Sequence, residues 1–409
     1  MKCAQEVGPL SSTSRMEFAG GGCVHYGQHR SDRQPQFRLQ TGRKTRTVWG
    51  HGRCTRDAVA THDIVVIGAS AGGVEAISTV VADLPRDLRA SVLVVLHLAK
   101  GRSMLPEILT RAGRLPAVHP DDGSRLEYGR IYVARPDHHL VVEPGHVRVV
   151  HGPTENGCRP AVDPLFRSAA RVYGPRVIGI VLTGGLDDGT AGLAAVKEAG
   201  GIAIVQDPDE AFAPSMPRSA RAFVNVDHVL PVREMGLLVA ALTREPADSQ
   251  PSVPGIHIAS LEPDLAEPPL VLHENDRPGK LSIFTCPECH GTLWEADNRG
   301  IVRFRCRVGH VYSAESMLAA QTDSVDRALW TALRSLEERA ALTHRLAERA
   351  RARRHNWVAR TFEERALAAD GHAAVIRELL VNRTTLHEVP ETDVEAPEDD
   401  ASVTKEYGG

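Results

Sequence analysis

Ser70 lies in a glycine-rich turn whose residue types fit two different chemistries. The turn reads GASAGG over residues 68–73; it follows the apolar run IVVI and precedes a helix-forming segment. A strand that leads into a helix N-terminus directs backbone N–H groups and the helix dipole at whatever lies in the turn. The turn therefore either binds a phosphate group or presents Ser70 as a nucleophile.

The phosphate interpretation is poorly supported. A dinucleotide-binding fold would carry Gly-x-Gly-x-x-Gly here and an acidic residue about 20 positions later, at the end of the second strand. This chain has neither feature, and its second apolar run, SVLVVLH, ends in His97. A P-loop is excluded as well, because no Lys-Ser or Lys-Thr follows the glycines.

The nucleophile interpretation fits better, since residues 68–72 match Gly-x-Ser-x-Gly, a turn that exposes a serine at the top of a sheet. The common α/β-hydrolase fold is nevertheless not predicted, because its nucleophile follows a later strand and its histidine comes last. Here the serine follows the first strand, and the late histidines lie in VNVDHVLP (His228) and in a proline-rich stretch (His257 and His273).

The ends of three apolar runs carry polar side chains that suit a hydrolase. Ser70 and His97 follow the first two runs, and RVIGIVLTGGLDDG delivers Asp187 and Asp188. In an open parallel sheet these positions meet beyond the carboxyl ends of the strands, at the switch point. His97 would take the proton of Ser70, an aspartate would fix the histidine tautomer, and turn N–H groups would bind the oxyanion.

Each of these residues also has a purely structural interpretation. Ser70 alone could cap a helix, His97 could be a hydrogen-bonded residue at a strand end, and the two aspartates could cap the next helix. Their joint placement at one edge of a sheet favours the catalytic interpretation.

A second constellation has the spacing of a metal site. A Cys-x-x-Cys pair is followed, after 16 residues, by a cysteine and a histidine four positions apart. Two close pairs of such ligands are typical of tetrahedral structural zinc, and no open position for catalysis is evident. We expect a folding role for the zinc and no ligand role for His290. The predicted ligands are Cys286, Cys289, Cys306 and His310.

The elements that must position these residues form several units. Short apolar runs alternate with amphipathic segments from residue 63 to about 244, which predicts a doubly wound α/β domain with a mostly parallel sheet and an inserted hairpin. Flanking it, the sequence predicts a disordered N-terminal extension, or an over-extended translation start, at 1–62; a proline-rich linker at 245–282; a small zinc ribbon at 283–315; a helical hairpin or short coiled coil at 316–383; and an acidic disordered tail at 384–409.

Composition excludes several classes of protein. The 409 residues carry a formal net charge of -4, so no global field argues for nucleic acid or an anionic membrane. No run of 18 or more apolar residues and no secretory signal is present, which predicts a cytoplasmic protein without membrane insertion. Seven cysteines, three of them in the predicted ribbon, fit a metal site better than a disulfide framework.

Residues 63 to about 242 resemble the catalytic domain of the CheB family of chemotaxis protein-glutamate methylesterases. The segments IGASAGGVEAI, VLHL, LPEIL, GRIYVARPDHHL, RPAVDPLFRSAA, GIVLTGGLDDGTAGL, AIVQDP and MPRSA occur in the order of the family. The resemblance implies a Rossmann-like fold and a serine hydrolase. By position, it implies a triad of Ser70, His97 and Asp188, oxyanion contacts from the backbone of Ala71 and Gly185, and a substrate cleft shaped by Arg159, Asp163 and Met216.

The resemblance also implies a substrate and partners. The family hydrolyses glutamate methyl esters on the cytoplasmic helices of chemoreceptors, releasing methanol, and some members deamidate glutamine there. Further expected partners are a receptor methyltransferase or other signalling proteins; catalysis needs no cofactor. The usual phosphoacceptor receiver domain of about 120 residues does not fit into 62 low-complexity residues, so we expect regulation by a partner or by the C-terminal extension, or a constitutive enzyme.

Two other functions are compatible with the sequence. One is a non-catalytic CheB-like module that binds signalling proteins, against which the complete Ser, His and Asp set argues. The other is an esterase for a different ester or amide. The helices after the predicted ribbon either bind another helical bundle, dimerise, or pack only on themselves.

Overall fold

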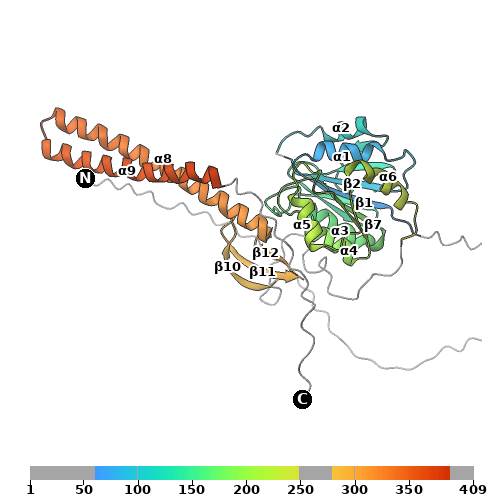
Figure 1. The fold of residues 1–409 in the computed structure, drawn as a ribbon. Coiled ribbons are helices and arrows are strands. Elements are labelled where there is room, and N and C mark those ends of the chain that lie inside the picture. Colours follow the sequence, from blue (N-terminus) through green and yellow to red (C-terminus); the bar gives the residue numbers. More distant parts are fainter. Residues whose placement is uncertain (1–59, 99, 248–278, 299, 387–409) are drawn as a thin grey trace, which may run out of the picture. The chain divides into compact units, whose positions relative to one another are not determined.

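A computed structural model describes residues 60–98, 100–247, 279–298 and 300–386 (Figure 1). Most of the predicted acidic tail, of the N-terminal extension and of the proline-rich linker lies outside the described residues. Residues 384–386 of the predicted tail are helical, and residues 280–282 of the predicted linker belong to a strand.

The first part of the described chain forms a seven-stranded parallel sheet, which confirms the predicted parallel α/β class. Its central strands are buried on both faces, as their uninterrupted apolar sequences predict. In spatial order the strands are β3 (Ala117–Val118), β4 (Arg130–Val133), β2 (Ser91–Leu96), β1 (Ile64–Ala69), β7 (Val177–Val181), β8 (Ile202–Gln206) and β9 (His228–Leu230). The short edge strands β3 and β9 were not predicted, because two or three residues are too few to show a periodicity.

Helices cover both faces of this sheet (Figure 1). Two separate apolar cores result, one on each side of the strands. One face carries α1 (Gly73–Ala82), α2 (Leu105–Ala112) and α6 (Val232–Leu242); the other carries α3 (Val162–Tyr173), α4 (Thr190–Glu198) and α5 (Ser215–Phe223), together with the antiparallel pair β5 (His139–Glu143) and β6 (His146–Val150). A short 3-10 turn, η1 (Gly174–Arg176), joins α3 to β7.

The switch point of the sheet lies at β1. The chain builds outward from β1 through β2 and β4 on one side and, later, through β7, β8 and β9 on the other. Ala69 pairs with Leu96 in the parallel register, so the next residues, Ser70 and His97, emerge side by side at the carboxyl edge. The amide of His97 donates to the carbonyl of Ala69 at 3.1 Å. Ligand and catalytic sites of open α/β sheets form at this place.

A small antiparallel sheet follows, which we call the ribbon. Its strands are β10 (Lys280–Thr285), β11 (Thr292–Asn298), β12 (Ile301–Cys306) and β13 (Val311–Ser313). Its core is small and consists of Cys286, Leu293, Phe304, Cys306, Tyr312 and Met317. So few buried apolar side chains hold a unit of this size together only with additional support.

Two long helices complete the described chain, α8 (Ala314–Ala352) and α9 (Asn356–Leu386). They run antiparallel, because Glu337 contacts Arg377 and His344 contacts Asp370. Their shared core is small, with Leu333, Ala373 and Leu380 as its buried members. None of the described helices is long and apolar enough to cross a membrane.

Candidate functional site

Ser70 is held at the end of β1 by its surroundings. Its amide donates to the carbonyl of Thr183 at 2.9 Å, and the hydroxyl of Thr183 donates to the carbonyl of Ala71 at 2.9 Å. A Cβ atom on Gly184 would lie 2.8 Å from the Cβ of Ser70 and 2.0 Å from the Sδ of Met216, so only glycine fits there. The turns after β1 and β7 are thereby locked against each other.

His97 contacts the second of the two neighbouring aspartates. Its Nε2 lies 2.7 Å from the Oδ2 of Asp188, and Asp188 is 2 % exposed. Asp187 instead accepts a hydrogen bond from the hydroxyl of Ser313 at 2.6 Å. The structure therefore brings Ser70, His97 and Asp188 to one edge of the sheet, where they follow the neighbouring strands β1, β2 and β7, and Ser70 follows the central strand of the three.

The carboxylates of Asp188 and Asp163 cap each other's helices. Neither α3 nor α4 has a side-chain cap of its own. Asp188, just before α4, accepts from the amides of Val162 (2.6 Å) and Asp163 (3.3 Å) at the start of α3. Asp163 in turn accepts from the amides of Gly189 (3.0 Å) and Gly192 (2.7 Å) of the α4 start. Both carboxylates lie at positive helix ends, which favour their charged forms.

The pKa values of the His97–Asp188 pair shift apart in the direction that an ion pair requires. Burial by itself raises the pKa of Asp188, but the hydrogen bond and charge of His97 and the Val162 amide outweigh it, and the pKa lies below its usual range. Burial likewise opposes the charged form of His97, yet Asp188, and after it the Cys158 side chain, raise its pKa. The site therefore stabilises a proton on His97 once it has arrived.

Two exposed amides border Ser70. Within the described residues, the N–H groups of Ala71 and Gly185 donate to no other protein group, and both residues are exposed. They come from the turns after β1 and β7, which the contact of Gly184 with Ser70 holds together. Two unpartnered donors at such a turn are available to an anionic oxygen.

The three residues expected to shape a substrate cleft lie in different surroundings. Met216 is fully buried beside Ser70 and Gly184. The guanidinium of Arg159 donates to Asp137 and to the carbonyl of Gly152. Asp163 is 1 % exposed and caps α4, so this structure gives it a structural place rather than one on a cleft wall.

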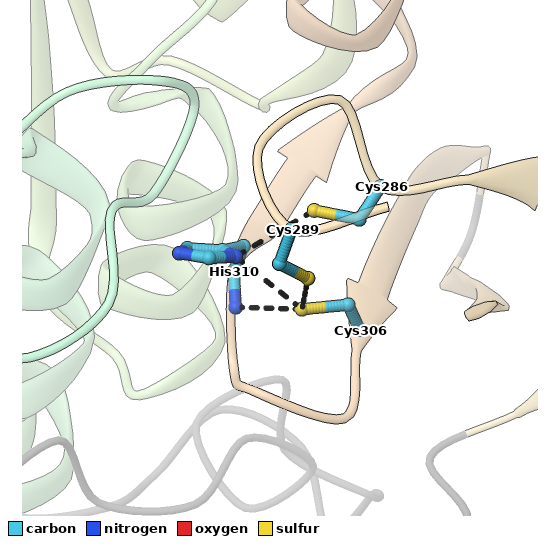
Figure 2. Close-up of side chains that lie close together, drawn as sticks. All are labelled: Cys286, Cys289, Cys306 and His310. Carbon is cyan, nitrogen blue, oxygen red and sulfur yellow. Dashed lines mark hydrogen bonds between the residues drawn. The ribbon is translucent and has the colours of Figure 1, made fainter. Parts of the chain in front are cut away.

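The ribbon gathers the four predicted metal ligands (Figure 2). The ligand atoms of Cys286, Cys289, Cys306 and His310 all lie within 4.8 Å of one another, and His290 does not belong to the group. The Sγ atoms of Cys289 and Cys306 are 3.6 Å apart, and the Nδ1 of His310 lies 3.5 Å from the sulfurs of Cys286 and Cys306. Zn–S bonds of about 2.3 Å in a tetrahedron place sulfurs roughly 3.8 Å apart, so the donor set fits such an ion.

Glu288 orients the histidine of this cluster. Its Oε2 lies 3.3 Å from the Nε2 of His310, and its Oε1 accepts from the hydroxyl of Tyr312 at 2.9 Å. Metal-binding histidines commonly present their second nitrogen to a carboxylate in this way. Thr154 of the α/β domain also donates to Glu288, so the cluster borders that domain.

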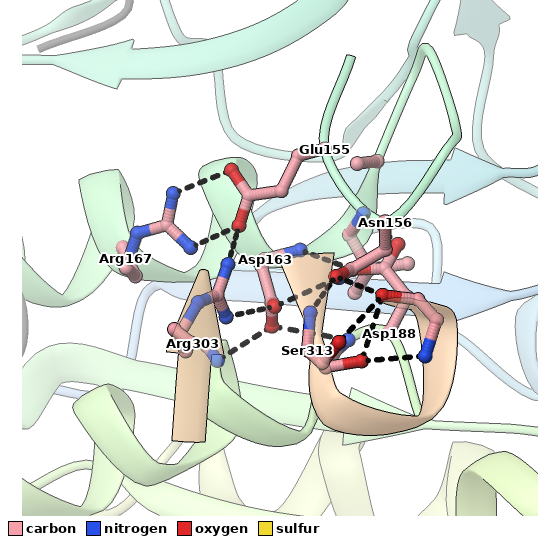
Figure 3. A network of polar contacts seen from close by, with 12 residues as sticks. Glu155, Asn156, Asp163, Arg167, Asp188, Arg303 and Ser313 are labelled. Carbon is pink, nitrogen blue, oxygen red and sulfur yellow. Dashed lines mark hydrogen bonds and ion pairs between the residues drawn. The ribbon is translucent and has the colours of Figure 1, made fainter. Parts of the chain in front are cut away.

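Arg303 of β12 enters a buried cluster of acidic groups in the α/β domain (Figure 3). It donates to Asp163 at 2.6 Å and to Glu155, which also receives both arms of Arg167 at 2.6 and 2.8 Å. Arg303, Arg167 and Glu155 are 8 %, 8 % and 1 % exposed. This cluster was not predicted, because its partners lie 140 and more positions apart in the chain and have no local sequence signal.

Asn156 joins this cluster to the catalytic candidates (Figure 3). Its Nδ2 donates to Asp188 at 2.9 Å and to Asp163 at 3.2 Å. Its Oδ1 accepts from the amide of Ser313 at 2.9 Å and from the hydroxyl of Ser316 at 3.1 Å. The C-terminal residues thus determine which end of the Asn156 amide faces the carboxylates.

Residues 60–247 therefore form a parallel α/β domain that carries Ser, His and Asp side chains at its switch point. Residues 65–239 match the family model described as CheB methylesterase. The chain is 35 % identical over 183 residues to a putative protein-glutamate methylesterase/protein-glutamine glutaminase of Leptospira interrogans serovar copenhageni, a match that covers 44 % of this chain and 95 % of that relative.

Two further proteins are similar to this chain. A protein-glutamate methylesterase/protein-glutamine glutaminase 2 of Anaeromyxobacter dehalogenans is 40 % identical over 183 residues, which are 44 % of this chain and about half (54 %) of that relative. The crystal structure of the Thermotoga maritima CheB methylesterase catalytic domain is 32 % identical and covers 44 % of this chain and 98 % of that one, with a TM-score of 0.43. The chain belongs to the CheB methylesterase family. The family match ends before the ribbon.

Proposed function

We propose that this protein is a protein-glutamate methylesterase that acts through Ser70, His97 and Asp188. The observation that supports this most directly is the 2.7 Å contact between His97 and the buried Asp188 at the switch point, next to the turn that carries Ser70. The names of the family members support the same reaction, hydrolysis of a methyl ester on a protein glutamate.

The proposed reaction follows from the arrangement of these groups. Because the Nε2 of His97 faces Asp188, the Nδ1 is the nitrogen that takes the proton of Ser70 as its oxygen attacks the ester carbonyl. The amides of Ala71 and Gly185 stabilise the oxyanion. His97 then gives its proton to the departing methoxide oxygen, which leaves as methanol. A water molecule that loses a proton to His97 next attacks the acyl-enzyme, and His97 returns that proton to Ser70 as the glutamate carboxylate is released.

The proposed substrate is a glutamate methyl ester on the cytoplasmic helices of a chemoreceptor. Deamidation of glutamine in the same segments would use the same acyl-enzyme, with ammonia as the leaving group, and two of the relatives carry both activities in their names. A receptor methyltransferase, which makes the ester, is the enzyme that would act before this one.

Methanol release from receptor membranes that carry radiolabelled methyl groups tests the proposal. Wild-type protein should release methanol, and Ser70→Ala should lower the rate by about 10⁴-fold or more. Ser78→Ala is the matched control, because within the described part of the chain this hydroxyl bonds only to the Val74 carbonyl of its own helix. Equal rates for wild type and Ser70→Ala would overturn the triad, and no release by a wild type whose Ser70 reacts with a fluorophosphonate probe would overturn the substrate.

We also propose that the cluster of three cysteines and His310 binds a structural zinc ion. The four donors leave no ligand position for substrate, and the ribbon core is too small to be stable alone, so metal binding would supply folding energy. The full-length protein should contain one zinc per chain, and Cys289→Ser should lose it. Retention of zinc by Cys289→Ser, or purification of a folded ribbon without metal, would contradict this proposal.

A further inference from the structure

The surroundings of Asp188 include groups from outside the family domain. Asp188 and Asp163 lie close together, and Glu155 lies beside Asp163, all of them almost fully buried. Two arginines face these three carboxylates, and one of the two, Arg303, comes from β12 of the ribbon. Buried charges are stable only when they are paired, so the ribbon supplies a charge that the α/β domain needs.

The amide of Asn156 depends on the same contact. If its oxygen faced Asp188, two acceptors would oppose each other. The backbone N–H of Ser313 and the hydroxyl of Ser316 bind the oxygen, so the NH₂ group is left to donate to Asp188 and Asp163. The backbone adds to this restraint, since the amide of Asn156 donates to the carbonyl of Val311 at 2.8 Å.

We infer that Arg303 is a positioning residue for the catalytic aspartate: by pairing with Asp163 it fixes, through Asn156 and the α4 start, the Asp188 carboxylate that holds His97. This inference rests on the proposed triad. The Leptospira interrogans relative is matched over 95 % of its length by 183 residues of this chain, a length that fits the α/β domain without the ribbon. The dependence on Arg303 is therefore a property of this chain rather than of the family domain.

The charge of Arg303 also has a predictable effect on protonation. A buried cation lowers the pKa of every acid and base around it, so its removal raises them. Burial already raises the pKa of Asp163, with Arg303 acting in the opposite direction. The titratable and charged groups that face the His97–Asp188–Asp163 chain from all sides are Cys158, Glu155, Arg167, Asp187, His139 and Arg303.

The rate at which a fluorophosphonate probe labels Ser70 in the full-length protein tests the inference without any receptor. Arg303→Met should lower the second-order labelling rate by about 10- to 100-fold, because the base is misplaced. The acid limb of the labelling rate should also move to higher pH, because the buried cluster that reaches Asp188 through Asn156 has then lost a cation. Arg307→Met is the matched control: Arg307 is exposed on the same ribbon, and its replacement should leave both rate and acid limb unchanged.

A conservative replacement separates positioning from folding. Arg303→Lys keeps the charge but reaches one carboxylate instead of two, so we expect a labelling rate between those of wild type and Arg303→Met, with an acid limb close to that of wild type. If Arg303→Met does not fold, the comparison of Arg303→Lys with Arg307→Lys carries the test. Labelling of a folded Arg303 variant at the wild-type rate and pH profile would overturn the inference, whereas a wild type that does not label would overturn the triad itself.

Discussion

The two buried polar centres of this protein, the His97–Asp188 pair and the cluster around Arg303, are assembled in different ways. The first arises within one sheet, because the register of neighbouring strands and the turn after β7 bring its members to one edge. The second arises only when the ribbon contacts the α/β domain, because one of its two cations belongs to β12. Sheet topology thus builds the reacting groups, and a second unit completes the electrostatics behind them.

Because the two centres are assembled differently, we expect their loss to affect activity and stability to different extents. A change in the His97–Asp188 pair alters the reacting groups directly and leaves most of the packing intact. A change in the cluster around Arg303 leaves the reacting groups in the chain but exposes three carboxylates to each other's charge. Activity should therefore respond most to the first change and stability most to the second.

The largest expected effect follows from Asp188→Asn. We expect the rate of methanol release to fall by about 10⁴-fold, as loss of the carboxylate leaves the histidine in the wrong tautomer. The carboxylate raises the pKa of His97, and the neutral form of His97 is the base. The acid limb of kcat/KM should therefore lie above the ordinary histidine pKa of about 6.5 in wild type and move to lower pH in the variant.

Pre-steady-state and steady-state rates between pH 5 and 10 measure both effects. Asp87→Asn, at an exposed aspartate, serves as the control with the same change of charge. An acid limb that stays at the same pH in Asp188→Asn would mean that His97 is not the group that titrates.

The first centre was largely predictable from the sequence and the second was not. Ser70, His97 and Asp188 follow apolar runs, and the ends of parallel strands must meet at one edge. The four metal ligands form two short motifs and also have a local signal. Arg303 has no such local signal, because it is one of two arginines that flank Phe304 in a segment with the alternation of a half-exposed strand. Only the contact between the ribbon and the α/β domain distinguishes Arg303 from its neighbour. Asp163 was predicted to shape a cleft, because its capping of α4 is a tertiary contact that the sequence does not reveal.

Replacement of the buried Arg303 should change stability more than replacement of the more exposed Arg176, although both effects are smaller than the loss of activity in Asp188→Asn. Arg303→Met should lower the free energy of unfolding by about 3 kcal/mol, because it leaves buried carboxylates without their partner. Arg176 pairs with Asp63 but has a side chain 36 % exposed, so Arg176→Met should cost about 1 kcal/mol or less. Urea unfolding followed by circular dichroism measures both, and equal costs would contradict the role of burial in this comparison.

Asp187 provides the finest test, since it lies between the two centres. Burial foremost, and then the carboxylates of Glu315, Asp163 and Asp188, raise its pKa to about 7, against the effect of the Ser313 hydroxyl. The folded state therefore binds a proton that the unfolded state has lost at pH values above about 4. The stability that this proton confers is complete below pH 4 and is lost as pH rises through 7.

Asparagine at position 187 keeps the oxygen that accepts from Ser313 and removes the charge. Asp187→Asn should therefore raise the melting temperature, and the gain in stability should be about 1 kcal/mol larger at pH 8 than at pH 5. Asp209→Asn, at an exposed turn, should give the same small change at both values. A gain in stability that is equal at pH 5 and pH 8 would contradict the raised pKa of Asp187. A gain that grows with pH would show that a negative charge on Asp187, beside the Ser313 hydroxyl of the ribbon, destabilises the folded protein.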